Sequence, residues 1–306
     1  MLIKDPPVEI AAGVRMLGTN EYPVFLVTDG DEGAIFEGGV GAAGPLVKEQ
    51  LAGLDVPADI VKQIIVTHAH PDHVMAVPAF RAMFPEATVC ASKAAAGTLA
   101  VEKAVRFFSK IDGMLTEALI KAGSIKDRHR PEPLTEKQIA VDKILADGDT
   151  LTVGRRKFDV LATPGHSDCS LSFYESATCL LIISDATGYY MPDCGYFWPN
   201  YFADYGAYIE SIRRLAALDA EIACLSHNAV VKGAEAVKAY FDGAAAATEA
   251  YHERIVAETA AGKAPDEISR QLGIEMHEKT QLLDVKFFEK NCELLVKQSL
   301  KYSQGD

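Results

Sequence analysis

The stretch Thr67-His-Ala-His-Pro-Asp-His73 carries three imidazoles and one carboxylate within six consecutive residues. In an extended chain, His68 and His70 point to the same side, so both can bind one ion. Asp72 and His73, beyond the turn that the proline makes, can serve a second ion. Divalent metals such as zinc accept both imidazole nitrogen and carboxylate oxygen. The stretch therefore predicts a metal site.

Three other apolar segments of the chain also end in a side chain that can bind a metal. They are Phe158–His166, Cys179–Asp185 and Ile222–His227, and they share this pattern with Val61–His68. An isolated histidine after a strand is more simply explained as a surface residue, and an isolated aspartate as a helix cap. Four strands that each deliver such a side chain at their carboxyl ends instead predict one dinuclear site, because loops at one end of packed sheets gather to form sites.

Strands and helices alternate as far as residue 230, and from there to the end the periodicity is helical only. This pattern predicts an α/β domain at residues 1–230 and a C-terminal helical extension at 231–306. The expected strands are Val14–Thr19, Val24–Thr28, Ala34–Glu37, Val61–Thr67, Leu151–Val153, Lys157–Thr163, Leu171–Tyr174, Cys179–Ser184 and Glu221–Ser226. The expected helices of the first domain include Pro45–Leu54, Val74–Phe84 and Ser92–Ala122, with breaks at Pro78 and Gly113.

The composition is that of a globular protein, with 49% hydrophobic and 24% charged residues among 306. The formal net charge of −13 has the wrong sign for holding nucleic acid or an anionic membrane. We expect neither as a partner. The N-terminus has no apolar signal region, and the chain has no apolar stretch of membrane-spanning length, so we expect a cytoplasmic protein.

Taken together, these motifs resemble those of the metallo-β-lactamase superfamily. The matching segments are T-H-A-H-P-D-H at 67–73, T-P-G-H-S at 163–167, S-D-A at 184–186 and S-H at 226–227, so that the resemblance covers roughly residues 10–230. It implies an αββα sandwich, classed as α/β or α+β, with the metals at one edge of its two sheets. The length and helical tail look most like the branch that contains the thioesterase of bacterial alkylquinolone signalling.

The resemblance also implies a ligand set. One metal would be held by His68, His70 and His166, a second by Asp72, His73 and His227, and Asp185 would bridge the two. We expect two divalent ions, zinc first, with iron and manganese as alternatives. Such a pair can lower the pKa of a shared water towards 7 and supply hydroxide for attack on a carbonyl carbon. Asp72 and Asp185 are the expected catalytic residues, with Asp72 orienting the water or relaying its proton.

The sequence departs from the usual family pattern at three places. Val74-Met75-Ala76 stands where glycines are common, Cys169 stands in place of a glycine, and Asn228 replaces a frequent glycine after His227. These changes remove no ligand. They concern the close packing of the loops and the contacts with substrate.

Residues 189–208 hold nine aromatic side chains in twenty positions. We expect Tyr189, Tyr190, Phe197 and Trp198 to wall a substrate pocket beside Asp185. Phe107, in the segment 101–137 between the metal motifs, is a further candidate for the pocket wall. Both segments could equally form a lid, plain core or a subunit interface, and the last would make the protein a homodimer.

An apolar pocket in an acidic protein favours a small, partly hydrophobic substrate with an acyl bond, namely a thioester, ester or lactone. A phosphodiesterase is the first alternative, although Arg106 and Lys110 are the only basic residues that the sequence places near the site. An iron-dependent oxidoreductase resembling sulfur dioxygenases is the second. A binding or signalling protein with structural metals is the third.

Overall fold

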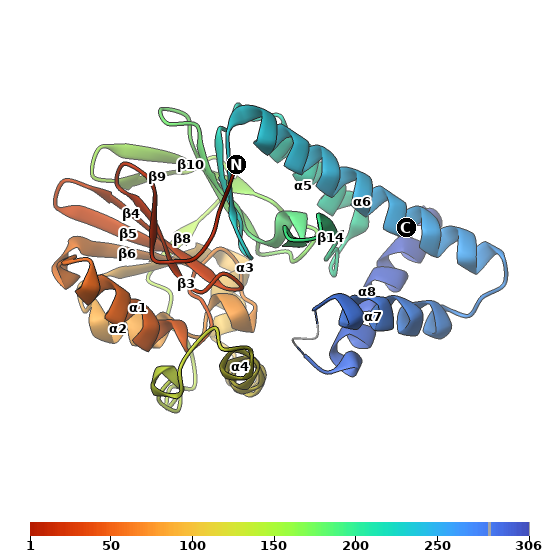
Figure 1. The fold of residues 1–306 in the computed structure, drawn as a ribbon, viewed down its shortest axis with the longest axis horizontal. Helices are drawn as coiled ribbons and strands as arrows, with labels where there is room; N and C mark the ends of the chain where they lie inside the picture. Colours follow the sequence, from red (N-terminus) through yellow and green to blue (C-terminus); the bar gives the residue numbers. More distant parts are fainter. Residues whose placement is uncertain (281–282, 306) are drawn as a thin grey trace.

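The computed structural model describes residues 1–280 and 283–305. Two seven-stranded sheets lie face to face, and helices cover the outer face of each, which gives four layers in the order αββα (Figure 1). Three further helices follow the last strand. The expected fold class is therefore confirmed.

The first sheet is built from the N-terminal part of the chain. Its strands, in spatial order, are β2 (Val8–Ala11), β3 (Val14–Gly18), β4 (Pro23–Asp29), β5 (Glu32–Phe36), β6 (Val61–Ile65), β7 (Thr88–Ser92) and β8 (Lys143–Leu145). The strands β2 to β5 pair antiparallel, and β5 to β8 pair parallel. The parallel half carries the histidine-rich stretch, which begins just after β6.

The second sheet combines the chain's start with its middle. Its spatial order is β1 (Leu2–Ile3), β16 (Val230–Lys232), β15 (Ile222–Cys224), β12 (Leu180–Ile182), β11 (Leu171–Glu175), β10 (Arg156–Ala162) and β9 (Thr150–Val153). Only β12 and β15 pair parallel within it. Three of its strands, β10, β12 and β15, precede the other expected metal-binding side chains.

The central strands are buried on both faces, which explains their continuous apolar sequences. In β4, Phe25 and Val27 point between the two sheets, whereas Val24 and Leu26 face the outer helices. Phe25, Phe36, Phe158 and Phe173 are fully buried, and Phe36 packs in the layer between the sheets with its ring 5.2 Å from that of Phe173. This aromatic layer joins the sheets and fixes the edge at which the loops meet.

Four helices cover the outer face of the first sheet, each with its apolar side against the strands. They are α1 (Ala43–Gly53), α2 (Val77–Met83), α3 (Lys93–Leu99) and α4 (Glu102–Ala122). The break expected at Gly113 is wrong, because α4 runs through it and the two helices α3 and α4 separate at Ala100 and Val101 instead. Gly113 is exposed, and a single glycine in a helix costs only about 1 kcal/mol, which the buried face of α4 offsets.

The second sheet is covered by α5 (Tyr205–Ala216) and α6 (Ala234–Ala260). The helix α6 extends past the edge of the sheet, and α7 (Pro265–Thr280) and α8 (Val285–Ser303) return against it (Figure 1). Ile255, Leu272 and Leu295 are fully buried where these helices meet. Within the described residues, no helix is both long and apolar enough to cross a membrane.

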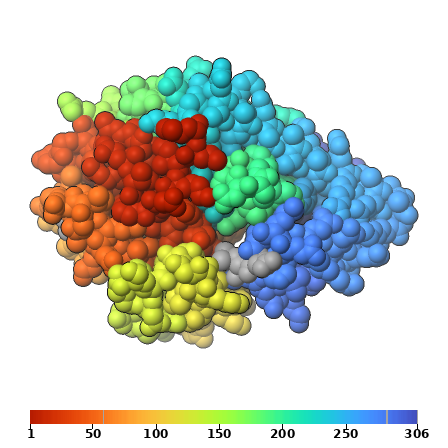
Figure 2. Space-filling model, viewed as in Figure 1, coloured from red at the N-terminus to blue at the C-terminus, as the bar shows by residue number. Residues whose placement is uncertain are grey.

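The aromatic segment after Asp185 forms a short hairpin of β13 (Tyr189–Met191) and β14 (Tyr196–Trp198). In this hairpin Tyr189 pairs with Trp198, and Tyr190 pairs with Phe197. Successive residues of a strand point to opposite faces, so the two pairs face opposite ways. Figure 2 shows the hairpin at the surface, close to the C-terminal helices.

Candidate metal centre

All seven side chains of the expected ligand set meet at the edge of the two sheets. His68 and His70 follow β6, and the 3₁₀ turn Pro71–His73 turns Asp72 and His73 towards them. The remaining three come from the second sheet: His166 follows β10, Asp185 follows β12 and His227 follows β15.

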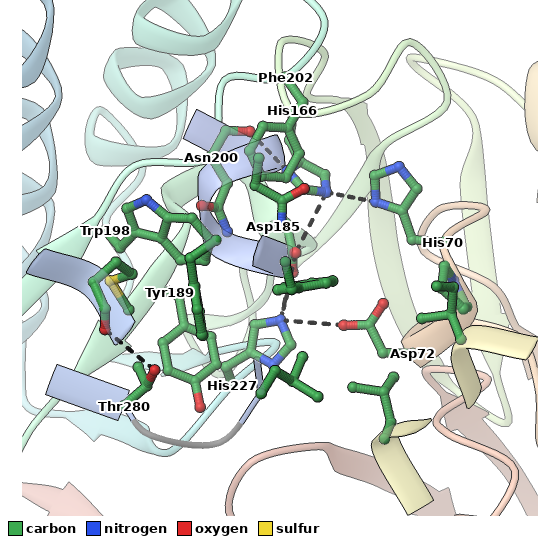
Figure 3. Close-up of a pocket in the computed structure, with 18 of the residues that line it drawn as sticks. His70, Asp72, His166, Asp185, Tyr189, Trp198, Asn200, Phe202, His227 and Thr280 are labelled. Carbon is green, nitrogen blue, oxygen red and sulfur yellow. Dashed lines mark hydrogen bonds and ion pairs between the residues drawn. The ribbon is translucent and has the colours of Figure 1, made fainter. Parts of the chain in front are cut away.

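Three histidines form the first ligand group. The Nδ1 atom of His70 lies 3.2 Å from Nε2 of His68. The same atom lies 2.8 Å from Nε2 of His166 (Figure 3). Ring nitrogens this close, all turned to one point, fit a shared cation. The 3.4 Å separation between His166 Nε2 and Asp185 Oδ2 brings a carboxylate to the same place.

Asp72, His73 and His227 form the second group. Asp72 Oδ2 lies 3.3 Å from His73 Nε2 and 3.9 Å from His227 Nε2. Asp185 reaches this group with its other oxygen, because Oδ1 lies 3.2 Å from His227 Nε2 and 3.5 Å from His73 Nε2. Asp185 therefore stands between the two groups, and its Oδ2 lies 3.4 Å from a histidine of each, His166 and His227.

Two buried atoms between the ligand groups indicate that these residues fit bound metals. His73 Nε2 and Asp185 Oδ1 are buried and have no hydrogen-bond partner among the described residues. A buried polar atom without a partner costs roughly 1–3 kcal/mol. Since both atoms point into the ligand groups, a metal ion there would satisfy them.

The opposite nitrogens of the rings are held by other parts of the chain. His166 Nδ1 donates to the carbonyl of Asn200 over 2.8 Å, and His227 Nδ1 donates to the carbonyl of Glu21 over 2.7 Å. Such outer contacts fix the tautomer, leave Nε2 free as the ligand atom and make it more basic. The protein thus presents these rings in the orientation that metal binding requires.

Glu37, at the end of β5, is the largest omission of the sequence analysis. Its Oε2 lies 2.8 Å from Nδ1 of His73, and its Oε1 accepts a hydrogen bond from the Thr67 hydroxyl over 2.9 Å. Thr67 in turn lies 3.3 Å from Nδ1 of His68. One buried carboxylate therefore orients a ring from each ligand group. Its position at the end of an apolar strand is the same signal that identifies the ligands.

Burial and charge set the protonation of the site. Burial lowers the pKa of His68, His70 and His166, that of His70 to about 3, so these rings are neutral and able to bind metal. Burial alone would raise the pKa of Asp72, but His73 beside it brings that pKa down to about 2. The pKa of Asp185 is likewise lowered despite its burial, chiefly by His227.

His73 and His227 behave differently from the other three rings. Burial would lower their pKa values, but the surrounding carboxylates outweigh it and raise both. For His73 the carboxylates are Asp72, Glu37 and Asp185, and for His227 they are Asp185 and Asp72. Without a cation, the second group therefore tends to hold protons. Metal binding there would release them.

The backbone leading to His166 depends on a glycine. Gly165 has a φ of 119°, and a Cβ atom on it would lie 2.3 Å from Cα of Tyr208 in α5. Its carbonyl accepts hydrogen bonds from the amides of Ala203 and Asp204, both over 3.0 Å. This close approach places the start of α5 against the His166 loop.

The ligands open into a cavity of about 280 Å³. Its wall is mostly apolar and includes residues from the hairpin, α4, α7 and α8 together with the site itself. The lining residues are Tyr22, His70, Pro71, Asp72, Phe107, Ile111, Leu115, His166, Asp185, Tyr189, Trp198, Asn200, Phe202, His227, Met276, Thr280, Leu283, Phe287, Phe288, Asn291 and Leu294. Figure 3 shows Tyr189, Trp198 and Phe202 beside the metal-binding side chains.

Three of the five side chains expected in the pocket wall line this cavity, namely Phe107, Tyr189 and Trp198. Tyr190 and Phe197 lie outside it, and this part of the expectation is corrected. Their rings stack on each other with centroids 4.4 Å apart and pack against Tyr240 of α6. The alternation of the hairpin puts them on the face turned away from the metals.

The two basic residues expected near the site are exposed. Arg106 pairs with Glu102 over 2.8 Å on the surface of α4, and Lys110 lies one turn further along that helix. Neither belongs to the cavity wall as the structure describes it. Tyr22, which does line it, gives no sequence signal, because a single tyrosine before a strand is unremarkable there.

The other three histidines lie elsewhere. His129 is buried beside Glu49, with 3.1 Å between Nε2 and the carboxylate. His252 stacks on Tyr205, and His277 lies near Phe288 with 6.0 Å between ring centres. They help to pack the loop after α4 and the C-terminal helices.

Known structures share this fold. A metallo-beta-lactamase family protein from Thermus thermophilus superposes with a TM-score of 0.65 at 21% identity, over 97% of this chain and 95% of that one. A Cronobacter sakazakii metallo-beta-lactamase, a mutant of the HARLDQ motif, superposes with a TM-score of 0.57 at 21% identity, over 85% of this chain and 100% of that one. The subclass B3 metallo-beta-lactamase BJP-1 of Bradyrhizobium japonicum superposes with a TM-score of 0.58 at 16% identity, over 85% of this chain and 97% of that one. Identities this low establish the fold alone.

The family itself follows from the sequence match. Residues 18–227 match the model of the metallo-beta-lactamase superfamily. The matched range begins at the end of β3 and ends at the ligand His227, so it contains all seven residues of the site. The chain belongs to the metallo-beta-lactamase superfamily.

Proposed function

We propose that this protein is a metal-dependent hydrolase that cleaves an acyl bond in a small, partly hydrophobic substrate. The observation that carries the proposal is the position of Asp185, whose carboxylate lies between two complete ligand groups at the floor of an apolar cavity. Two divalent ions held there would supply an activated water and stabilise negative charge on the oxygen under attack. Zinc suits the nitrogen and carboxylate donors, and iron and manganese are the alternatives.

Asp72 is the residue best placed to move a proton. Its side chain keeps 22% of its surface exposed, whereas Asp185 keeps 5%, and it lines the cavity. As a carboxylate on the cavity side of the second ligand group, it can accept a proton from an attacking water. The same carboxyl can then return the proton to the departing alkoxide or thiolate.

Two tyrosines lie beside the second ligand group. Tyr22 and Tyr189 both line the cavity and flank the ring of His227, with ring centres 5.5 and 4.9 Å away. Burial raises the pKa of both hydroxyls, that of Tyr189 to about 12, so both stay protonated, and the Tyr189 hydroxyl donates its hydrogen bond to Oδ1 of Asn228 over 3.3 Å. The Tyr22 hydroxyl can instead donate a hydrogen bond to the carbonyl oxygen as that oxygen gains charge.

The cavity wall favours acyl substrates over phosphodiesters. Apolar and aromatic side chains suit a neutral acyl group, whereas a phosphodiester calls for cations along the wall. Among acyl bonds we place the thioester first because the layout of the chain, with its helical tail, resembles a thioesterase branch. Esters and lactones require the same residues.

Elemental analysis of protein purified without chelator, followed by assays on the same sample, tests the proposal. We expect two metal equivalents per chain and cleavage of thioester, ester or lactone substrates, lost on chelation and restored by zinc. Asp185→Asn should lose activity and metal together, whereas Asp168→Asn, an exposed carboxylate after His166, should lose neither. If the protein cleaved only phosphodiesters, a phosphodiesterase would replace the proposed acyl hydrolase. If it held iron and consumed oxygen, an iron-dependent oxidoreductase would replace it.

A further inference from the structure

The cavity above the metal centre is walled by elements outside the two sheets. One side is α4, through Phe107, Ile111 and Leu115, which recur at helical spacing along one face. The opposite side is formed by α7 and α8, through Met276, Phe288, Leu294 and their neighbours. In Figure 2, α4 and the C-terminal helices lie next to each other along the lower part of the molecule. The apolar space is therefore added to the sandwich by two separate segments.

The wall changes in exposure from the metals outwards. Leu115, Met276 and Phe288 are buried, with at most 3% of their surface exposed. Phe107 and Leu294, which line the same cavity from opposite helices, are 57% and 37% exposed. Among the described residues, the cavity wall thus runs from a buried apolar interior to an exposed apolar rim at Phe107 and Leu294. Single exposed apolar residues are common on proteins, but these two line the same, mostly apolar cavity.

From this arrangement, and resting on the proposed function, we infer that the acyl group of the substrate carries an extended alkyl chain. The carbonyl lies at the metals, the first part of the chain fills the interior between α4 and α8, and the rest leaves between Phe107 and Leu294. Fatty acyl thioesters or esters of medium to long chain are the class that fits. Short acyl groups would leave much of the apolar wall in contact with water.

The open rim makes a specific prediction about chain length. Each methylene buried in the interior should raise kcat/KM by about fourfold, from its transfer free energy. Once the alkyl chain of the substrate reaches the rim, further methylenes should neither raise nor lower kcat/KM appreciably, because they extend into solvent. We therefore expect kcat/KM to rise from butanoyl upwards and then level off towards tetradecanoyl, rather than fall.

Two variants and two matched controls test the rim. Phe107→Ser and Leu294→Ser should lower the ratio of dodecanoyl to butanoyl kcat/KM by about fivefold or more, because each removes apolar surface from the path of the chain. Met114→Ser and Ile274→Ser replace side chains that are each 42% exposed, on α4 and α7, and that do not line the cavity. These controls should leave the ratio unchanged.

A binding experiment separates this inference from the proposed chemistry. Dansyl-labelled dodecanoate should bind the chelator-treated wild-type protein, and more weakly after Phe107→Ser or Leu294→Ser. Equal cleavage of all chain lengths, or a ratio that the rim variants do not change, would overturn the inference while acyl hydrolysis stands. Probe binding without cleavage of any acyl substrate by the metal-loaded protein would instead reject the hydrolase. A steep loss of activity beyond one chain length would show a closed cavity and overturn the open rim.

Discussion

Glu37 Oε2 lies 2.8 Å from Nδ1 of His73, and both side chains are almost completely buried. Glu37 also adopts a φ of 81°, a left-handed conformation that non-glycine residues seldom take. A buried carboxylate on a strained backbone persists only where the surroundings require it. Here it joins His73 to Thr67, and through Thr67 to His68, so that one residue braces both ligand groups.

Replacing this carboxylate by an amide should weaken metal binding without removing a ligand. We expect Glu37→Gln to lower metal affinity by about 10–100-fold, because His73 loses the partner that fixes its tautomer and raises its basicity. Competition with a chromogenic chelator measures the change. Glu9→Gln, an exposed glutamate of the same sheet, is the control. Unchanged affinity in Glu37→Gln would mean that the contact serves packing only.

Asp72→Asn tests the proton-transfer role directly. The amide cannot accept a proton, so we expect kcat to fall by about 10²–10⁴-fold. Metal content must be measured on the same sample, since Asp72 also belongs to the second ligand group. Full turnover with both metals retained would exclude Asp72 from the chemistry. A parallel loss of one metal would assign it to binding instead.

The residues of the site can be predicted from local sequence, because each ligand follows an apolar strand. The helices that complete the cavity cannot. Met276, Phe288 and Leu294 have only the spacing of ordinary core residues, and nothing in the sequence says that α7 and α8 return to face α4. That packing depends on where α6 ends relative to the sheets. Their contribution to the cavity appears only in three dimensions.

The secondary structure, too, can be predicted in part from local sequence and depends in part on tertiary packing. The strands around the ligands agree with the sequence prediction within a few residues, but β7 is absent from it, because Thr88–Ser92 is short and lies between two helical patterns. It is fixed by pairing with β6 and β8 on both sides, which is a tertiary effect. The composition of the aromatic segment predicts a pocket wall but not the alternation of its hairpin.

The presence of Asn228 after His227, where the family often has glycine, has a structural explanation. Asn228 has a φ of 68°, in the region that favours glycine and that asparagine tolerates better than most residues. Its side chain donates to the carbonyl of Tyr190 over 2.7 Å and accepts from the Tyr189 hydroxyl over 3.3 Å. The amide thereby links the loop of His227 to the aromatic hairpin, a contact that glycine could not make.

A buried carboxyl in α4 predicts a pH dependence of stability. Asp112 is 5% exposed and accepts a hydrogen bond from the Gly41 amide over 2.7 Å. Burial raises its pKa from 3.8 to about 6, although the amide of Gly41 opposes the shift. The folded protein therefore holds a proton that the unfolded chain releases between these values. The stability that Asp112 contributes is therefore fully present below about pH 4 and is lost as the pH rises through about 6.

The loss over this interval should be at most about 3 kcal/mol from this one group. Asp112→Asn removes this titration and should make the unfolding free energy fall less steeply between about pH 4 and about pH 7. Urea titrations of the metal-free protein at several pH values measure it. Asp31→Asn, an exposed aspartate, should keep the wild-type slope. An unchanged slope in Asp112→Asn would show that this carboxyl titrates normally.

The two faces of the aromatic hairpin should separate catalysis from stability. Tyr189 lines the cavity beside His227, so Tyr189→Ala should lower kcat/KM by at least about tenfold. Phe197 lies on the other face, against Tyr190 and Tyr240, so Phe197→Ala should cost about 2 kcal/mol of stability and change kcat/KM by less than about threefold. Steady-state kinetics and urea unfolding on both variants test the contrast. If Phe197→Ala lowered kcat/KM as much as Tyr189→Ala does, the hairpin would act on substrate as one unit, and the alternation of its side chains would not decide which of them meets the substrate.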